Sequence, residues 1–144
     1  MDLRRGAALV ECAASVLIAA LVVAGCSQQA QQPQMDGTRW TLSGWAESTP
    51  IPADVTITAE FTGTTLSGNS GVNSYSGAYE AEGSGAFSAG PLAGTMMAGP
   101  KPAMDAEAAY LRRLEAARSY AMTAGTLVLK DGEGKDSLTF KTAQ

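Results

Sequence analysis

The side chains that could do chemistry in this chain of 144 residues do not include an imidazole, because the sequence contains no histidine. A Ser-His-Asp or Cys-His nucleophile system and a histidine-ligated metal site all need that group, so these classes are excluded. The only cysteines are Cys12 and Cys26, which rules out a four-cysteine metal site and a disulfide framework. We therefore expect no metal site and no cofactor.

A hydrolase that uses a serine or threonine with a lysine base is an alternative hypothesis. Lys101 lies near Thr95 in the sequence, but it stands between two prolines in a predicted loop. Lys130 and Lys135 are the other candidate bases. This hypothesis requires one of the three lysines beside a hydroxyl in a pocket, and we prefer a protein without catalytic activity.

The acidic residues do not form a convincing catalytic pair. Glu80 and Glu82 would lie about 6–7 Å apart on one strand face, but Tyr79 and Ala81 face inward, so theirs is the solvent face. Residues 105 and 107, both acidic, would point about 200° apart on a helix. The acids of residues 131–136 lack the ligand pattern of a calcium loop and are interpreted as turn residues. A net charge of −4 without a basic stripe also argues against nucleic-acid binding.

The N-terminal segment has the pattern of a secretion signal. Arg4 and Arg5 precede residues 13–24, an apolar run that is shorter than the roughly 20 residues of a bilayer-spanning helix. The run ends in Val23-Ala24-Gly25-Cys26, which resembles the bacterial lipobox. That resemblance implies that residues 1–25 are a lipoprotein signal peptide. The peptidase would recognise Val23, Ala24 and Gly25 and cleave before Cys26, whose thiol receives the lipid.

Residues 26–36 are polar and of low complexity, so we expect the lipidated cysteine to be followed by a flexible tether. The lipid would supply essentially all of the membrane affinity, because an acidic protein is repelled from anionic head groups. The expected location is the extracytoplasmic side of the cell membrane or outer membrane. Ser27, in place of an aspartate after the cysteine, is compatible with export to an outer membrane.

Residues 37–144 have the pattern of one α+β domain, with short antiparallel strands in a small sheet or partial barrel and one packed helix. Alternating apolar residues predict strands at 38–45 and 55–61. Shorter strands separated by glycine-marked turns are predicted at 64–67, 78–82, 86–88, 121–123, 126–130 and 137–141.

One helix is predicted late in the chain. Asp105 is expected to cap it, and Glu107 to interact with the dipole of its first turn. Its apolar face is predicted to contain Tyr110, Leu111 and Leu114, extended by Ala103 and Ala117. We interpret the basic pair at 112–113 as part of a solvated face rather than as a site for an anionic partner.

The segment from Gly68 to Tyr79 resembles the Gly-Asn-Gly signature of the META domain, the HslJ-like family of bacterial lipoproteins. The likeness begins at Trp40-Thr41-Leu42, continues through Thr95-Met96-Met97 and the predicted helix, and covers nearly all of residues 37–141. The motif residues that it singles out are Gly71, Asn73, Gly77, Tyr79, Thr95, Met97 and Glu107.

We interpret these motif residues as structural. Glycines permit sharp bends, and Asn73 can bond its own backbone in a turn, whereas the functional alternative is a nest of backbone N–H groups for an anion. Met96 and Met97 are predicted to fill gaps in the core, and the alternative is an adaptable binding surface.

One departure from the family pattern concerns cysteine. Members usually carry one cysteine after the glycine of the first motif and another after the Thr-x-Met segment, where this chain has Val72 and Gly99. The joint loss implies that the two act as a pair, close in space, in members that have them. The departure leaves this domain without a covalent link and puts a redox role in doubt.

The resemblance implies a lipid-anchored cell-envelope protein with a part in stress tolerance. We expect a binding or scaffold module whose partners are the membrane, through its lipid, and an envelope protein or small ligand. An alternative is a carrier that holds an apolar molecule between sheet and helix, in a cavity lined by Met96, Met97, Phe87 and Leu111.

Overall fold

The computed structural model describes residues 35–143, which form nine strands and one helix. The elements are β1 (Thr38–Trp45), β2 (Thr58–Thr62), β3 (Thr65–Asn69), β4 (Ser74–Ala81), β5 (Phe87–Ala89), β6 (Ala93–Gly94), α1 (Lys101–Ala116), β7 (Ser119–Thr123), β8 (Thr126–Lys130) and β9 (Asp136–Thr142). The predicted lipobox, Val23-Ala24-Gly25-Cys26, and most of the predicted tether lie outside the described residues. No helix within residues 35–143 has the length and apolar character needed to cross a bilayer.

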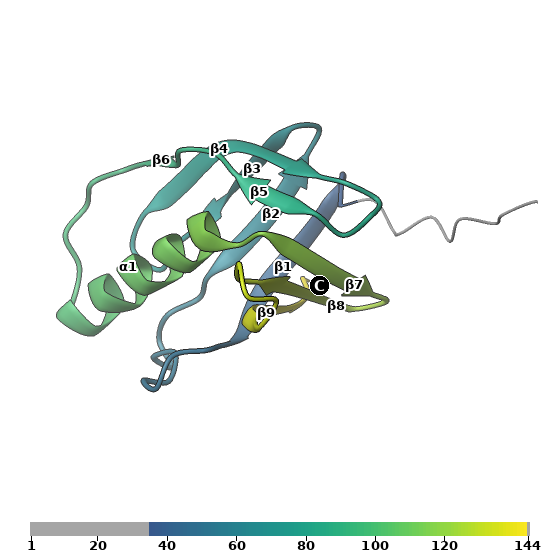
Figure 1. The fold of residues 1–144 in the computed structure, drawn as a ribbon. Helices are drawn as coiled ribbons and strands as arrows, with labels where there is room; N and C mark the ends of the chain where they lie inside the picture. The colour runs from purple at the N-terminus through teal and green to yellow at the C-terminus, as the bar shows by residue number, and fades with distance from the viewer. Residues whose placement is uncertain (1–34, 144) are drawn as a thin grey trace, which may run out of the picture.

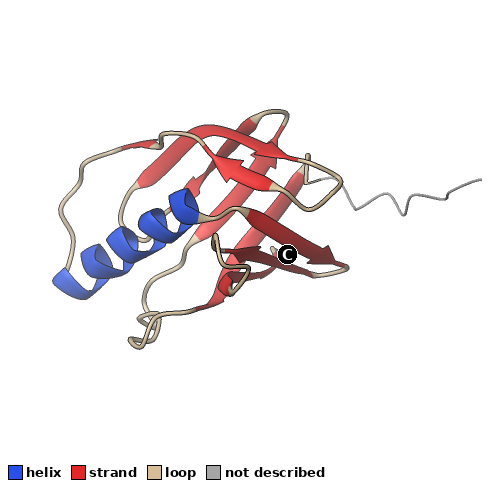
Figure 2. Cartoon of the chain, viewed as in Figure 1, coloured by secondary structure: helices blue, strands red, loops and turns tan. Residues whose placement is uncertain are grey.

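The strands form one antiparallel sheet that curls into a nearly closed barrel (Figure 2). Their order is β5-β4-β3-β2-β1-β9-β8-β7, and the short β6 pairs with β4. A bridge between Ala86, the residue before β5, and Ser119 of β7 brings the two ends of the sheet together. Helix α1 lies along the open side of this barrel and contacts β5 and β9 (Figure 1). The predicted α+β partial barrel with one packed helix is therefore confirmed.

Alternation of apolar side chains places one face of each long strand in the core. In β8, Leu127 and Leu129 are completely buried, whereas Val128 between them is half-buried. Phe61 of β2 makes an edge-to-face contact with Tyr79 of β4, with ring centroids 4.9 Å apart. Such a pair adds about 0.5–1.5 kcal/mol to the stability that its buried area provides. The sequence predicts these strands because the alternation of apolar and polar residues involves only neighbouring positions.

The strand predicted at 55–61 begins later than expected. β2 starts at Thr58, although Val55 and Ile57 are buried as the alternation predicted. The backbone N–H of Leu42 donates to the carbonyl of Ile57 at 2.9 Å, so this segment still lies beside β1. The expected solvent face of β4 is confirmed, because Glu80 is exposed and Tyr79 is buried.

Helix α1 begins four residues before the predicted cap. Pro100 is its N-cap and makes no side-chain capping bond, and Pro102 lies in the first turn, where a missing backbone N–H costs little. The prediction that Asp105 caps the helix was therefore wrong, as was the loop predicted around Lys101. Asp105 instead accepts a hydrogen bond from Lys101 Nζ at 2.7 Å, one turn earlier.

Candidate functional site

Five of the seven family-motif residues come together where the loop after β3 meets α1. Gly71 and Asn73 belong to this loop, Thr95 and Met97 follow β6, and Glu107 extends from the buried face of the helix. Glu107 is 8% exposed and Asn73 is 4% exposed. We call Ser70, Val72, Asn73, Thr95 and Glu107 the Glu107 cluster.

The Glu107 carboxylate is the anion of this cluster. Its Oε2 accepts hydrogen bonds from Ser70 Oγ at 2.7 Å, from the backbone N–H of Asn73 at 2.8 Å and from that of Val72 at 3.2 Å. The loop therefore does form a nest of backbone N–H groups, but the anion in the nest is the protein's own side chain. Gly71 fits because its φ of 123° is unfavourable for other residues, and a Cβ there would lie 3.1 Å from Val55 Cγ1.

Hydrogen bonding determines the ionisation of Glu107. Burial alone would raise the pKa of this carboxyl group, but the bonds from the Asn73 side chain, from Ser70 and from the backbone of Asn73 and Val72 together outweigh it. The pKa of Glu107 consequently lies below its ordinary value of 4.5. The group is ionised at neutral pH and serves as a fixed acceptor.

The side-chain amide of Asn73 connects this nest to the segment after β6. Its Oδ1 accepts from Thr95 Oγ1 at 2.8 Å and from the backbone N–H of Met97 at 2.7 Å. Its Nδ2 donates to Glu107 Oε1 at 2.8 Å and to the carbonyl of Met97 at 3.2 Å. The expectation that Asn73 would bond its own backbone was wrong, because the amide instead links segments 22–34 residues away in the chain.

Gly77 and Tyr79 lie apart from the Glu107 cluster, farther along β4. A Cβ on Gly77 would lie 2.7 Å from the carbonyl oxygen of Pro91 and 2.8 Å from Leu92 Cδ2, so the glycine admits the segment that crosses it. The ring of Tyr79 packs on Phe61 and Phe87 in the core. Both residues shape the barrel.

The prediction that Met96 and Met97 fill the core was wrong. Met96 is 98% exposed and Met97 is 57% exposed. The Asn73 side chain accepts from the N–H of Met97 and donates to its carbonyl, which holds this segment at the surface. Phe87, by contrast, is 3% exposed in the core. The ligand cavity expected between Met96, Met97, Phe87 and Leu111 is therefore not formed by this set.

A groove of about 360 Å³ lies between the loop after β1 and the first half of α1. Its walls are largely apolar, with charges at the rim, and we call it the Trp45 groove. Trp45 is fixed there because its indole N–H donates to the carbonyl of Thr49 at 2.9 Å. The lining residues are Trp45, Glu47, Thr49, Pro50, Pro52, Lys101, Pro102, Asp105, Ala106 and Ala109.

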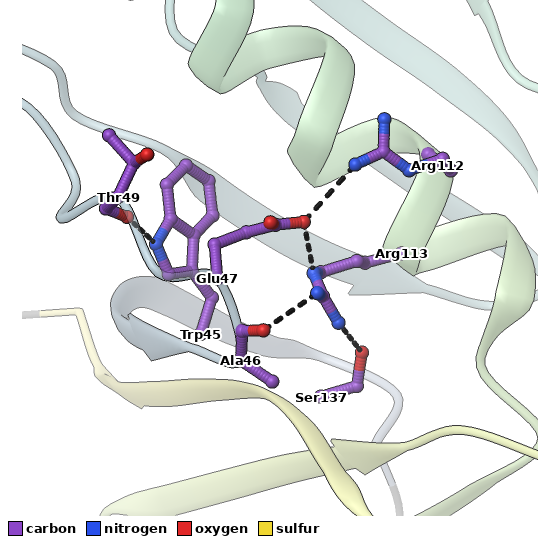
Figure 3. A network of polar contacts seen from close by, with 7 residues as sticks. All are labelled: Trp45, Ala46, Glu47, Thr49, Arg112, Arg113 and Ser137. Atoms are coloured by element: carbon purple, nitrogen blue, oxygen red, sulfur yellow. Dashed lines mark hydrogen bonds and ion pairs between the residues drawn. The ribbon is translucent and has the colours of Figure 1, made fainter.

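An arginine of α1 holds the loop wall of this groove (Figure 3). Arg113 donates to Glu47 Oε1 at 2.8 Å, to the carbonyl of Ala46 at 2.8 Å and to Ser137 Oγ at 3.2 Å. Arg112 reaches the same carboxylate oxygen at 3.1 Å. Hydrogen bonding from Arg113, followed by the charges of both arginines, outweighs burial and lowers the pKa of Glu47.

The prediction that both basic residues lie on a solvated face is therefore wrong for Arg113. The side chain of Arg113 is 22% exposed and that of Arg112 is 66% exposed. Sequence reasoning missed Trp45 and Glu47 as groove residues. Glu47 and Arg112 carry opposite charges, but they lie 65 residues apart in the chain. No sequence pattern relates residues at that separation, so their contact could not be predicted.

Arg113→Ala is expected to lower the free energy of unfolding by about 1–2 kcal/mol, because it removes three hydrogen bonds at a half-buried position. The backbone amides of the loop 46–52 should exchange with deuterium faster than in the wild type. Urea unfolding and hydrogen exchange measure the two effects. Arg112→Ala is the matched control and should change stability by less than about 0.5 kcal/mol. Equal effects of the two variants would contradict the conclusion that Arg113, rather than Arg112, holds the loop.

The candidate lysine bases are paired with carboxylates. Lys101 and Thr49 share the lining of the Trp45 groove, but Lys101 Nζ donates to Asp105. Lys130 Nζ lies 2.6 Å from Asp136 and Lys135 Nζ lies 2.6 Å from Glu133. Over residues 35–143, none of these three ammonium groups donates to a serine or threonine hydroxyl, and no cluster of acids fit to hold a metal ion is present.

Comparison with known proteins identifies the family. The family model described as "META domain" matches residues 33–144. The chain belongs to the META domain family. Among curated proteins, none matches the chain.

Solved structures share the META domain fold seen here. The structure solved by NMR of a protein from Burkholderia xenovorans is 31% identical, with a TM-score of 0.63, over 76% of this chain and 84% of that one. The crystal structure of a DUF4847-family protein from Bacteroides vulgatus is 14% identical, with a TM-score of 0.55, over 74% of this chain and 93% of that one. At that identity, the second likeness concerns the fold alone.

Proposed function

We propose that this META-domain protein is a lipid-anchored module on the extracytoplasmic side of the envelope, which binds a partner protein or small ligand in the Trp45 groove and has no catalytic activity. The proposed link to envelope stress tolerance comes from the family resemblance. The observation that carries the binding proposal is the groove itself, an apolar hollow between a pinned loop and a helix.

The position of the groove supports this proposal. The described chain enters β1 on one side of the barrel, and the loop after β1 and the start of α1 lie on the opposite side (Figure 1). The eight residues of β1 span about 23 Å between these two sides. A lipid on Cys26 would therefore hold the domain at the side opposite the groove and leave the groove accessible to a partner.

The interior of the groove suits a ligand with an apolar part. Its volume of about 360 Å³ is at the small end of the range for ligand pockets, roughly 300–1,000 Å³. Trp45 and the prolines offer rigid apolar contact, which costs little conformational entropy on binding. Lys101, Asp105 and Glu47 at the rim could orient a polar group.

Cys26→Ala is expected to abolish the lipid-mediated attachment of the mature protein to the membrane, because an acidic domain gains no affinity from anionic head groups. Fractionation of cells, with detection of the protein and its acylation, measures the effect. The variant should appear as precursor or in the soluble fraction, and the wild type in the membrane fraction. Cys12→Ala is the matched control and should leave attachment unchanged. A mature, membrane-bound Cys26→Ala protein would refute the lipid anchor.

Site-specific photocrosslinking tests the groove. A photoreactive residue at Ala109, in the groove wall, should capture a defined partner or ligand in intact cells. The same residue at Ser84, an exposed turn position outside the groove lining, is the control. Capture at position 109 that Trp45→Ala abolishes, with none at position 84, supports the proposal. Identical products from both positions would refute it.

A further inference from the structure

The exposed methionine pair is left unexplained by the proposed function. Met96 and Met97 are the large hydrophobic residues that the described chain exposes, at 98% and 57%. Met35 is 3% exposed, and Met104 and Met122 are half-buried. The described chain thus presents two adjacent thioethers to solvent, and its other methionines are less exposed.

The exposure of the pair follows from a fixed backbone. The N–H and the carbonyl of Met97 both bond the Asn73 amide, at 2.7 and 3.2 Å. The N–H of Thr95 donates to the carbonyl of Ser74 at 3.0 Å. On the far side of the pair, Gly99 packs against Val72, since a Cβ there would lie 2.8 Å from Val72 Cγ2. The segment cannot turn the methionines inward without breaking these contacts.

None of the contacts that hold the segment involves a methionine sulfur. The bonds to Asn73 use the backbone of Met97, and the bond to Asn73 Oδ1 from Thr95 uses a hydroxyl. A change in polarity of the two side chains would therefore leave the Glu107 cluster intact. Met35 differs from this pair because it is buried in the core. Its oxidation would place a polar sulfoxide among apolar side chains.

Methionine thioethers are the only sulfur groups in residues 35–143 that an oxidant can attack. Residues 35–143 contain no cysteine, so no thiolate competes for a two-electron oxidant. Exposure then decides which methionine reacts first, because the oxidant must reach the sulfur lone pair.

We propose that Met96 and Met97 form an oxidant-accepting site, at which hydrogen peroxide or hypochlorous acid converts the thioethers to sulfoxides while the fold is retained. With peroxide, the sulfur lone pair attacks one oxygen, an S–O bond forms and the O–O bond breaks. The sulfur loses two electrons, and the displaced oxygen leaves as water after taking up the proton of the transferred one. With hypochlorous acid, chloride and a proton are released instead.

The reaction can be reversed by a reductase that uses thiols to return methionine sulfoxide to methionine. Each thioether consumes one equivalent of oxidant per cycle. The domain therefore removes oxidant without a thiol of its own, in a chain that has Val72 and Gly99 where the family resemblance implies a cysteine pair.

Peptide mapping by mass spectrometry tests the proposal on the full chain, purified with its lipid in detergent and treated with graded hydrogen peroxide or hypochlorous acid. Oxidation of Met96 and Met97 should be at least about tenfold faster than that of Met35. The midpoint of thermal unfolding should not change after the first two oxygen atoms are added. Met96→Leu with Met97→Leu should remove these two fast additions and leave the unfolding midpoint unchanged.

Three results would overturn the proposal. The first is equal oxidation rates for Met35 and the exposed pair, and the second is unfolding that accompanies the first additions. The third is the absence of sulfoxide at Met96 and Met97 when cells that lack methionine sulfoxide reductase are exposed to the same oxidants and the purified protein reacts.

Discussion

Glu107→Ala is expected to lower the free energy of unfolding by about 3–5 kcal/mol. The carboxylate accepts from Ser70 Oγ, from two backbone N–H groups and from the Asn73 amide. Its removal leaves these donors without an acceptor in a buried site. Each buried donor left unpaired costs about 1–3 kcal/mol, and entering water recovers part of the loss.

Glu107→Gln keeps the size and shape of the side chain but removes its negative charge. It retains one acceptor oxygen but presents an NH₂ group to donors, so about half of the effect should remain. Urea unfolding followed by tryptophan fluorescence measures both variants, because Trp40 is buried in the core. Glu115→Ala, exposed on the same helix, is the control and should cost less than about 0.5 kcal/mol. A loss below about 1 kcal/mol for Glu107→Ala would contradict the central place of this carboxylate.

The same carboxylate gives stability a pH dependence of known sign. Since the pKa of Glu107 in the folded protein lies below 4.5, its contribution is complete above the unfolded pKa and is lost as the pH falls through the folded value. Unfolding at a series of acid pH values should show this decline in the wild type. Glu107→Gln should have a flatter profile over the same range.

Val72→Cys with Gly99→Cys is expected to form a disulfide and to raise the free energy of unfolding by about 2–4 kcal/mol. A Cβ on Gly99 would lie 3.5 Å from Val72 Cβ, which is within the separation found across disulfides, about 3.5–4.5 Å. Removal of the two valine methyl groups also clears the space that a Cβ at 99 needs. The structure thus places side by side the two positions at which the family usually has cysteine.

The experiment needs a background in which Cys12 and Cys26 are serine, so that the new pair has no competitor. A thiol count before and after reduction detects the bond, and urea unfolding measures its effect. The double variant Val72→Ser, Gly99→Ser is the control, since it has the same size but cannot form the bond. Two free thiols under air oxidation, or equal stability of oxidised and reduced protein, would show that the geometry is unsuitable.

The barrel was predictable from the sequence because its signals are local. Val55, Ile57, Ala59 and Phe61 alternate with polar residues, and all four are buried as that pattern indicates. The helix face containing Tyr110 and Leu114 follows in the same way from a period of 3.6 residues. The start of the helix was misplaced because Asp105 is a good capping residue, whereas Pro100 gives no comparable signal.

The Glu107 cluster was not predictable in detail, because its hydrogen bonds join distant parts of the chain. Asn73 was expected to act locally, as asparagine often does in turns, but its amide is fully used by Thr95, Met97 and Glu107. That bonding also explains the wrong prediction for Met96, since hydrophobicity alone places a methionine in the core. Tertiary hydrogen bonds between Asn73 and the backbone of the neighbouring Met97 hold this segment at the surface instead.

The Trp45 groove depends on a similar long-range contact. Trp45 is out of phase with the buried Trp40 and Leu42 in the alternation of β1, but this local pattern does not connect it with a later helix. Its role appears only when Arg113, from a helix much later in the chain, fixes the loop that follows. Residues of this kind need the three-dimensional structure to be recognised.

The central position of β1 has a mechanical consequence. This strand is hydrogen-bonded to β2 on one side and to β9 on the other, and it runs from the tether side of the barrel to the groove. In a molecule held by its N-terminal lipid and engaged at the groove, tension would act along β1. Hydrogen bonds in an antiparallel sheet are perpendicular to the strands, so both ladders would be sheared together rather than opened one bond at a time. If the proposed lipid anchor holds the N-terminal side, β1 is thus placed to resist pulling.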